Sequence, residues 1–247
     1  MLAEALCRVR GSSLPVPSPV GHGFQLAAVD AVVNSPMRIT AYEARQHSLC
    51  GLRQDGGAAF NHHTRHFTAD QLNVLGAVRE HFQEKALNVP VQFPNSLYVF
   101  MGPPVDAVDS ICRNGLVALR DTDAGFFGLG CYTTLSIEYA ARYARGDLAG
   151  TLRAQSADNM LPMIMFAASV GMAYPVTPGL DYARQRVDGH SDCFGAPLKR
   201  GFDCHVACVS QAAGFEAVSR ADCQYSELVM DQESQLLPIA VMWFHSN

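Results

Sequence analysis

Three stretches of the chain carry residue types that could take part in chemistry. They are the histidine-rich HHTRH at 62–66, the run Cys204, His205 and Cys208, and the carboxylate of Glu227 in QYSELVMD. Imidazole and thiolate groups are the ligands that zinc prefers, and a fixed carboxylate can stabilise a developing positive charge. Spacing decides which of these chemistries the chain can support.

Neither cluster of histidine and cysteine matches a metal site. His62, His63 and His66 have no ligand-type spacing and no carboxylate partner, so a polar loop is the simpler interpretation. Cys204 and His205 are neighbours on a predicted strand, and adjacent strand residues point to opposite faces. We therefore predict no metal ligands and interpret the strand cysteines as small buried hydrophobes.

The glycine-rich segment GFFGLGCY at 125–132 is not a phosphate-binding loop. It lacks a following Lys-Ser/Thr pair, and no G-x-G-x-x-G pattern opens a helix there. Taken alone, it predicts only a tight turn that runs into a strand. Glu227 taken alone is equally consistent with a solvated charge on a strand, which is the common case for acidic residues.

The elements that must position these residues are mostly strands in the second half of the chain. Apolar alternation and turn residues predict an α+β fold. We expect strands at 97–100, from 131, 160–176, 202–209, 225–231 and 237–244, with an irregular loop at 177–201. We expect helices at 68–87, 105–115 and 136–146.

Two of these helices carry clear end signals. Thr68 followed by Gln71 is typical of a capping box, and Leu72, Leu75, Val78 and Phe82 would form the apolar stripe of that helix. Ser136 is a predicted N-cap and Gly146 a predicted stop for the helix at 136–146.

Composition limits the function classes. The chain has 247 residues, of which 49 % are hydrophobic and 17 % charged, so it can bury a sizeable core and is not a disordered protein. Its formal charge of −5 includes no basic cluster for non-specific nucleic-acid binding. Its 8 cysteines are scattered within apolar patterns, which favours a reducing compartment, with disulfides in a secreted protein as the alternative.

Location and domain organisation follow from the ends of the chain and from one apolar segment. The first residues lack a signal-peptide pattern. The uncharged segment 160–176 is short for a membrane span and contains Pro162, Gly171 and Pro175. We expect an intracellular protein, cytoplasmic or nuclear, with no membrane partner. We also expect an N-terminal extension at 1–90, with a linker-like arm at 11–23, and a main domain at 91–247.

The order of the motifs resembles one family. LYVFMGPPVDAVDSICRNGL (97–116), GFFGLGCYTTLSIEYAARYA (125–144) and YSELVMDQESQLLPIAVMWF (225–244) resemble the catalytic domain of ADP-ribosyltransferases of the poly(ADP-ribose) polymerase and diphtheria-toxin type. HSDCFGAPLKRGFDCHVACV (190–209) fits more weakly, and residues 1–90 are not covered. The resemblance implies split antiparallel β-sheets around a cleft that holds NAD as co-substrate, with short flanking helices.

The resemblance also implies a role for individual residues. The backbone of Gly102 would hold the nicotinamide carboxamide, and Tyr132 and Tyr143 would stack on the nicotinamide ring. Glu227 would be the catalytic residue: it would bind the nicotinamide ribose and stabilise the oxocarbenium-like charge as the glycosidic bond breaks.

The sequence departs from the family pattern at two cofactor-binding positions. Met101 stands where the family has a ribose-binding histidine, and Ala140 where it has a carboxamide-binding serine. Each lost contact would cost about 1–3 kcal/mol if its partner stays buried, which weakens NAD binding roughly 5- to 150-fold. Arg113, Arg120 and Asp121 are the candidates to replace these contacts.

These observations lead to competing expectations for function. The first is a mono-ADP-ribosyltransferase that modifies a protein acceptor, with a nucleic-acid end as an acceptor that the charge does not favour. Single transfer is expected because the polymerising members of the family keep the histidine. The alternative is a catalytically inactive binding module of the same fold. A transferase acting on 2′-phosphorylated RNA ends is a weaker third reading, because the basic site it needs is missing.

Overall fold

The computed structural model describes residues 6–8, 24–52, 67–85, 96–117, 125–146, 160–182 and 190–246. The strands are β1 (Leu6–Arg8), β2 (Phe24–Val32), β3 (Leu97–Met101), β4 (Cys131–Thr134), β5 (Met160–Ala168), β6 (Ala173–Val176), β7 (Cys204–Val209), β8 (Tyr225–Met230) and β9 (Leu236–Ser246). The α-helices are α1 (Pro36–Leu52), α2 (Ala69–Lys85), α3 (Val108–Asn114), α4 (Ile137–Arg145) and α5 (Pro178–Asp181), and short 3₁₀ turns lie at 105–107, 211–213, 220–222 and 233–235.

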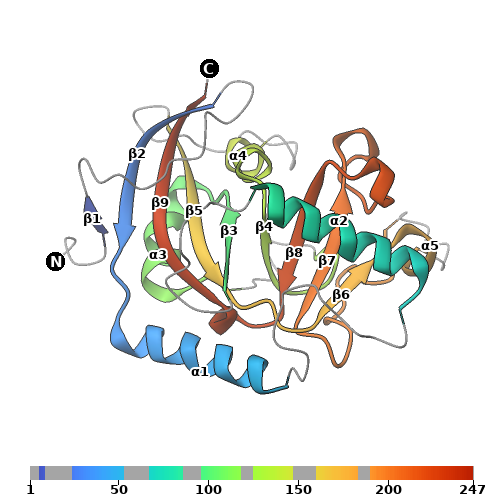
Figure 1. Cartoon of the computed structure of the whole chain (residues 1–247). Helices are drawn as coiled ribbons and strands as arrows, with labels where there is room; N and C mark the ends of the chain where they lie inside the picture. The colour runs from blue at the N-terminus through green and yellow to red at the C-terminus, as the bar shows by residue number, and fades with distance from the viewer. Residues whose placement is uncertain are drawn as a thin grey trace.

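The strands of the described residues form one open sheet in the order β1-β2-β9-β5-β3-β4-β8-β7-β6 (Figure 1). Neighbouring strands are antiparallel except β6 and β7, which run parallel. The chain is therefore a mixed α+β protein, as its sequence predicts. Within the described residues, no helix combines the length and the apolar character that a membrane crossing requires.

The segment 160–176 differs from its prediction as one long strand. It forms β5 and β6, which lie far apart in the strand order and are separated by a turn at 169–172. Gly171 makes this turn possible because it adopts a φ of +66°, and a Cβ there would lie 2.5 Å from the side chain of Asp203. In the described part of the irregular loop expected at 177–201, α5 forms one helical turn, which Thr177 caps.

Helix α2 covers the strands of one half of the sheet. Its buried Val74, Leu75 and Val78 belong to the same apolar cluster as residues of β7 and β8, and Figure 1 shows the helix lying across these strands. The expected capping box is present: the Thr68 N–H donates to Gln71 Oε1 at 3.1 Å, and the Gln71 N–H donates to Thr68 Oγ1 at 3.2 Å. Leu72 was expected in the apolar stripe, but it is exposed because the buried face is displaced toward Val74.

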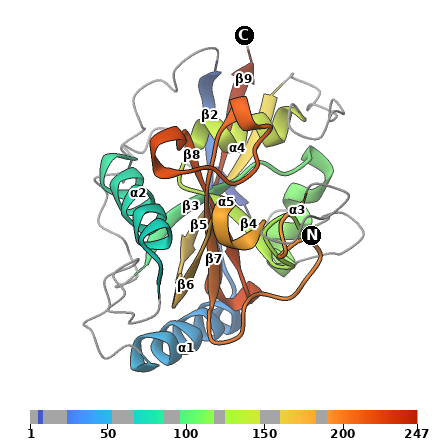
Figure 2. The ribbon, with the colours of Figure 1, turned by 90° about the vertical axis from the view of Figure 1, so that its right-hand side faces the viewer.

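The described residues before position 90 pack against the same sheet as the rest of the chain. Strand β2, for which the sequence shows only weak patterning, pairs with β9, and the buried Tyr42 of α1 packs on Leu237 of β9. Arg38 of α1 donates to the carbonyl of Arg113 at the end of α3. A 90° turn of the view places α2 and α3 to either side of the strands (Figure 2). The arm at 11–23 lies outside the described residues, and the boundary near residue 90 stays a prediction.

Candidate functional site

The two halves of the sheet are joined at one residue pair. Strands β3 and β4 are paired only at Phe100 and Thr134, whereas β3 pairs along its full length with β5, and β4 with β8. Phe100 directly precedes Met101, and Thr134 belongs to β4, the strand that also carries Tyr132. The residues singled out in the sequence therefore converge on the place where the sheet is least continuous.

Helix α4 packs beside this junction, and its local sequence explains its position. Ser136 caps it by accepting a hydrogen bond from the Tyr139 N–H at 3.3 Å, and Gly146 ends it with a left-handed φ of 86°. Both end signals were predicted from the sequence. Residues four positions apart lie on the same side of a helix. Two neighbouring faces of α4 make contacts at this junction.

One face of α4 packs against Gly102. A Cβ built at Gly102 would lie 1.9 Å from the carbonyl oxygen of Ala140 and 2.6 Å from the backbone nitrogen of Ala144. The end of β3 therefore touches the backbone of two successive turns of α4, which only a glycine permits. The structure thus brings Gly102 and Ala140 into contact.

The adjacent face of α4 points two tyrosine hydroxyls at Glu227. The Tyr139 hydroxyl donates to Glu227 Oε2 at 2.6 Å, and the Tyr143 hydroxyl donates to the same oxygen at 3.3 Å. Glu227 is only 3 % exposed, so it is a buried carboxylate and not the solvated strand charge that is the common case. Hydrogen bonds to Oε2 stabilise the charged form of such a group.

Tyr139 is itself completely buried. Burial, followed by the nearby charge of Glu227 and the Tyr143 hydroxyl, raises the pKa of Tyr139 well above its ordinary range. The hydroxyl therefore stays protonated and remains a donor at physiological pH. Its ring stacks on the ring of Tyr225, with centroids 4.9 Å apart and planes within 10°.

Tyr132 lies on the same face of the sheet as Glu227. Directly opposed residues of an antiparallel pair share a face, and Tyr132 opposes Val229 while Thr134 opposes Glu227. Tyr132 and Glu227 are thus diagonal neighbours, about 7–8 Å apart. The Tyr132 hydroxyl accepts the Phe127 N–H and donates to the Gly128 carbonyl, each at 2.8 Å, which fixes the ring against the glycine-rich turn.

The two departures from the family pattern both sit in apolar surroundings. Met101 pairs with Ile164 and packs against the cluster that contains Ile164 and Val99, while Phe100 turns toward α4. Ala140 is fully buried in the cluster of Phe100. The structure therefore groups Met101 with the apolar core on one side of β3, and groups Gly102, Tyr143 and Glu227 around α4.

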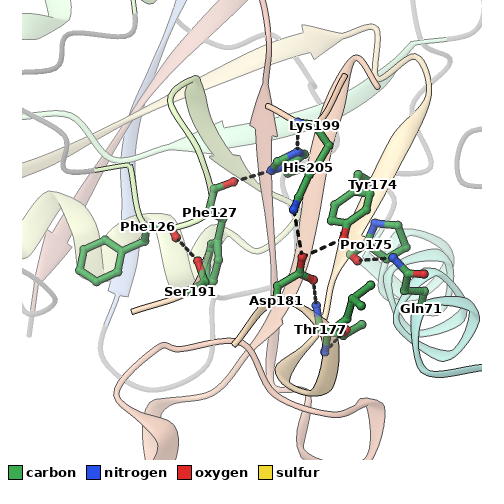
Figure 3. A network of polar contacts seen from close by, with 11 residues as sticks. Gln71, Phe126, Phe127, Tyr174, Pro175, Thr177, Asp181, Ser191, Lys199 and His205 are labelled. Atoms are coloured by element: carbon green, nitrogen blue, oxygen red, sulfur yellow. Dashed lines mark hydrogen bonds and ion pairs between the residues drawn. The ribbon is translucent and has the colours of Figure 1, made fainter. Parts of the chain in front are cut away.

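A buried histidine holds the glycine-rich turn that carries the Tyr132 hydroxyl contacts (Figure 3). His205 Nε2 accepts the Lys199 N–H at 2.8 Å, so the proton is on Nδ1, which donates to the Phe127 carbonyl at 2.6 Å. Burial lowers the pKa of His205 to about 4, so the ring is neutral. Gly128, with a φ of +114°, passes so close that a Cβ would lie 3.2 Å from Nδ1.

The buried carboxylate of Asp181 holds the end of β6 and the residue that follows it. Asp181 accepts the Tyr174 hydroxyl and the Thr177 N–H, each at 2.8 Å, and its Oδ1 lies 3.7 Å from Lys199 Nζ (Figure 3). Every one of these contacts is internal to the fold. We therefore assign Asp181 a structural role.

Sequence reasoning missed Tyr139 and the role of His205. The signal for Tyr139 was its spacing of four residues from Tyr143, which puts both hydroxyls on one face of a predicted helix. Cys204 packs in an apolar cluster on one face of β7, whereas the ring nitrogens of His205 bond Lys199 and Phe127. Among the described residues no group of three or more potential ligands could hold a metal ion.

Of the residues expected to replace the two missing NAD contacts, only Arg113 lies in the described part of the chain. Arg113 forms a helical ion pair with Asp109 at 2.8 Å. Arg120 and Asp121, like His62, His63 and His66, lie outside the described residues. Cys112, Cys131, Cys193, Cys204 and Cys208 are buried and Cys223 is partly buried, in agreement with the interpretation of the cysteines as small apolar residues.

This arrangement can do one kind of chemistry well. A buried carboxylate held by tyrosine hydroxyls, on a face lined with aromatic rings, is suited to stabilising a cationic transition state next to a flat ring. No protein-family model matches the chain, and no curated protein shows significant similarity to it. Assignment of a function therefore rests on the residues and their geometry.

Proposed function

We propose that this protein is a mono-ADP-ribosyltransferase that takes NAD as donor and a protein side chain as acceptor. The bond from the nicotinamide nitrogen to C1′ of the ribose breaks, and its electron pair leaves with neutral nicotinamide. The acceptor nucleophile forms the new bond to C1′ and releases its proton to solvent. Glu227 stabilises the oxocarbenium-like charge that develops on the ribose between these events.

The observation that carries this proposal is the buried carboxylate of Glu227, with two tyrosine hydroxyls on one of its oxygens. A carboxylate that is removed from water costs free energy unless its charge is used or neutralised. The two hydroxyls on Oε2 fix the direction of this carboxylate, and because they are neutral they leave its negative charge in place. A site that stabilises an arriving positive charge explains this arrangement best.

The remaining assigned residues support the binding of the donor. In this proposal Gly102, where β3 meets α4, presents its backbone to the nicotinamide carboxamide, and Tyr132 and Tyr143 stack on the ring. The single-pair junction between β3 and β4 supports the finer fold assignment, in which two half-sheets border an NAD cleft. Met101 and Ala140 lack the family's polar groups, so we expect weak NAD binding and single transfer without elongation.

The test is release of nicotinamide from NAD together with labelling of the protein by NAD carrying a label on the ADP-ribose. Nicotinamide release reports cleavage even when the acceptor is missing, because water can serve as nucleophile. Glu227→Gln keeps the shape but removes the charge, and we expect it to lower turnover on the order of 10²- to 10³-fold. Glu233→Gln is the matched control: it makes the same change at an exposed glutamate in the turn after β8, and it should retain wild-type turnover.

Two results would contradict the proposal. One is the absence of both nicotinamide release and labelling by the wild-type protein at millimolar NAD. The other is equal turnover by the wild-type protein and Glu227→Gln.

One observation favours a second candidate function, that of a binding module without catalysis. Ala140 is fully buried among apolar side chains, and Met101 packs on the core. Such a module would bind a nucleotide or a partner with the same face but leave the glycosidic bond intact. Calorimetry with NAD separates the two: binding without nicotinamide release favours the module, and binding with release excludes it.

A further inference from the structure

Two stacked tyrosines exchange hydrogen bonds between α4 and β8. Tyr139 of α4 donates to Glu227 Oε2 on β8 at 2.6 Å, and Tyr225 of β8 donates to Glu138 Oε1 on α4 at 2.8 Å. The pattern is reciprocal, because each ring reaches a carboxylate that is anchored on the other element. Both rings are buried, and the bond between Tyr139 and Glu227 is shielded from water, whereas the bond between Tyr225 and Glu138 is only partly buried.

The two hydrogen bonds differ in what surrounds their carboxylates. Glu138 is partly exposed and also accepts from Arg142 at 3.1 Å, so a cation already neutralises its charge. Glu227 is buried, and its Oε2 accepts from the hydroxyls of Tyr139 and Tyr143. Loss of the Tyr139 hydroxyl removes a hydrogen bond from a buried carboxylate, whereas loss of the Tyr225 hydroxyl removes one from a partly exposed carboxylate that also bonds Arg142.

The two donors to Glu227 are also unequal. The 2.6 Å contact from Tyr139 is typical of a hydroxyl bound to an ionised carboxylate, whereas the 3.3 Å contact from Tyr143 is long for an O–H···O bond. Tyr139 is held by stacking on Tyr225 and by its contact with the ring of Phe215, 5.5 Å away. It cannot turn to contact substrate without breaking this packing.

We propose that Tyr139 is a positioning residue for Glu227: its hydroxyl holds Oε2 in place and thereby sets the direction in which Oε1 is presented and stabilises the charged form of the carboxylate. The catalytic consequence rests on the proposed transferase function. The positioning itself is a property of the folded protein and can be measured without any substrate.

Several groups on α4, β4 and β7 face Glu227 and bear on its titration. The tyrosine hydroxyls come from α4, and the strand neighbours on the same face are Thr134 of β4 and Ala207 of β7. Tyr132 lies diagonally across on β4. His81 of α2 bonds Ser226, whose side chain is on the opposite face of β8.

The test compares Tyr139→Phe with Tyr225→Phe. Each variant loses one buried hydroxyl from one ring of the same stacked pair, so a purely structural role predicts similar effects from both. The carboxyl of Glu227 is titrated by carbon NMR in protein labelled at glutamate, and its signal is identified by its loss in Glu227→Gln. We expect the midpoint of Glu227 to rise in Tyr139→Phe and to stay at the wild-type value in Tyr225→Phe.

Turnover provides the second measurement. For nicotinamide release we expect Tyr139→Phe to lower kcat about 10- to 150-fold, the equivalent of one hydrogen bond to a charged group, with little change in KM. The acid limb of its pH profile should move to higher pH. Tyr225→Phe should keep the wild-type pH profile.

The outcomes separate the two proposals. If the wild-type protein does not release nicotinamide, the function is wrong, but the NMR titration still decides the positioning. An equal midpoint for Glu227 in wild type and Tyr139→Phe, or equal shifts in both variants, would overturn the positioning. If Tyr139→Phe does not fold, difluorotyrosine at position 139 keeps the shape with a stronger donor and should lower the midpoint; an unchanged midpoint would again overturn it.

Discussion

Acidification from pH 7 to pH 5 is expected to lower the free energy of unfolding by about 2 kcal/mol through His205 alone. The imidazole is completely buried, and both ring nitrogens are used: Nδ1 donates to the Phe127 carbonyl and Nε2 accepts the Lys199 N–H. A second ring proton would face a donor at Nε2. Burial, assisted by the charge of Lys199, therefore lowers the pKa to about 4.

The sign and size of the effect follow from linkage. The folded-state pKa lies below the ordinary value of 6.5, so the unfolded chain takes up the proton first as the pH falls. The contribution of His205 is complete above pH 6.5 and is lost as the pH falls toward 4. Each pH unit inside this window is worth about 1.4 kcal/mol, which amounts to about 2 kcal/mol between pH 7 and pH 5.

Urea unfolding at pH 7, 6 and 5 measures this loss, and His205→Gln isolates it. The glutamine amide can both donate and accept but does not titrate. Carboxylates elsewhere in the chain contribute to the pH dependence of both proteins and cancel in the difference. We expect the wild-type protein to lose about 2 kcal/mol more than His205→Gln. Parallel pH dependences of the two proteins would refute the assignment of His205 as a buried neutral ring.

Two further substitutions test how α4 is held at the sheet junction. Gly102→Ala forces a Cβ against the Ala140 carbonyl and should lower the free energy of unfolding by about 1–3 kcal/mol or more in chemical denaturation. Gly179→Ala, whose Cβ would lie 3.8 Å from Asp70 Oδ2, should stay within about 0.5 kcal/mol of wild type. Ser136→Ala removes the acceptor for the Tyr139 N–H and should cost about 1 kcal/mol; a change near zero would mean that this cap does not hold the helix.

Much of the site was predictable because its parts are local in sequence. Ser136 and Gly146 mark the ends of α4, and Thr68 and Gln71 form the predicted capping box of α2. Each of these features depends on contacts between residues at most four positions apart. Gly102 was singled out as the residue whose backbone holds the nicotinamide carboxamide, which stays a prediction; the group that approaches it closely in the structure is the backbone of α4.

The features that were missed depend on long-range pairing. The uncharged run at 160–176 has the composition of one strand, and only the sheet order shows that it supplies two strands far apart. Strand β2 has weak local patterning, and the strand that stabilises it by pairing, β9, lies more than 200 residues later. Strand order depends on packing of the whole chain, and residue periodicity carries little information about it.

The sequence by itself determined the α+β class and the ends of the central helices, because propensity, capping and alternation act over a few residues, whereas Glu227 was singled out through the family resemblance. Only the tertiary structure decided that Glu227 is buried and that Tyr139, 88 residues away, donates to it. It also decided that α4 links Gly102 to Glu227 across the junction of β3 and β4. Such contacts arise only when distant segments pack together, since burial and hydrogen-bond partners are properties of the folded chain.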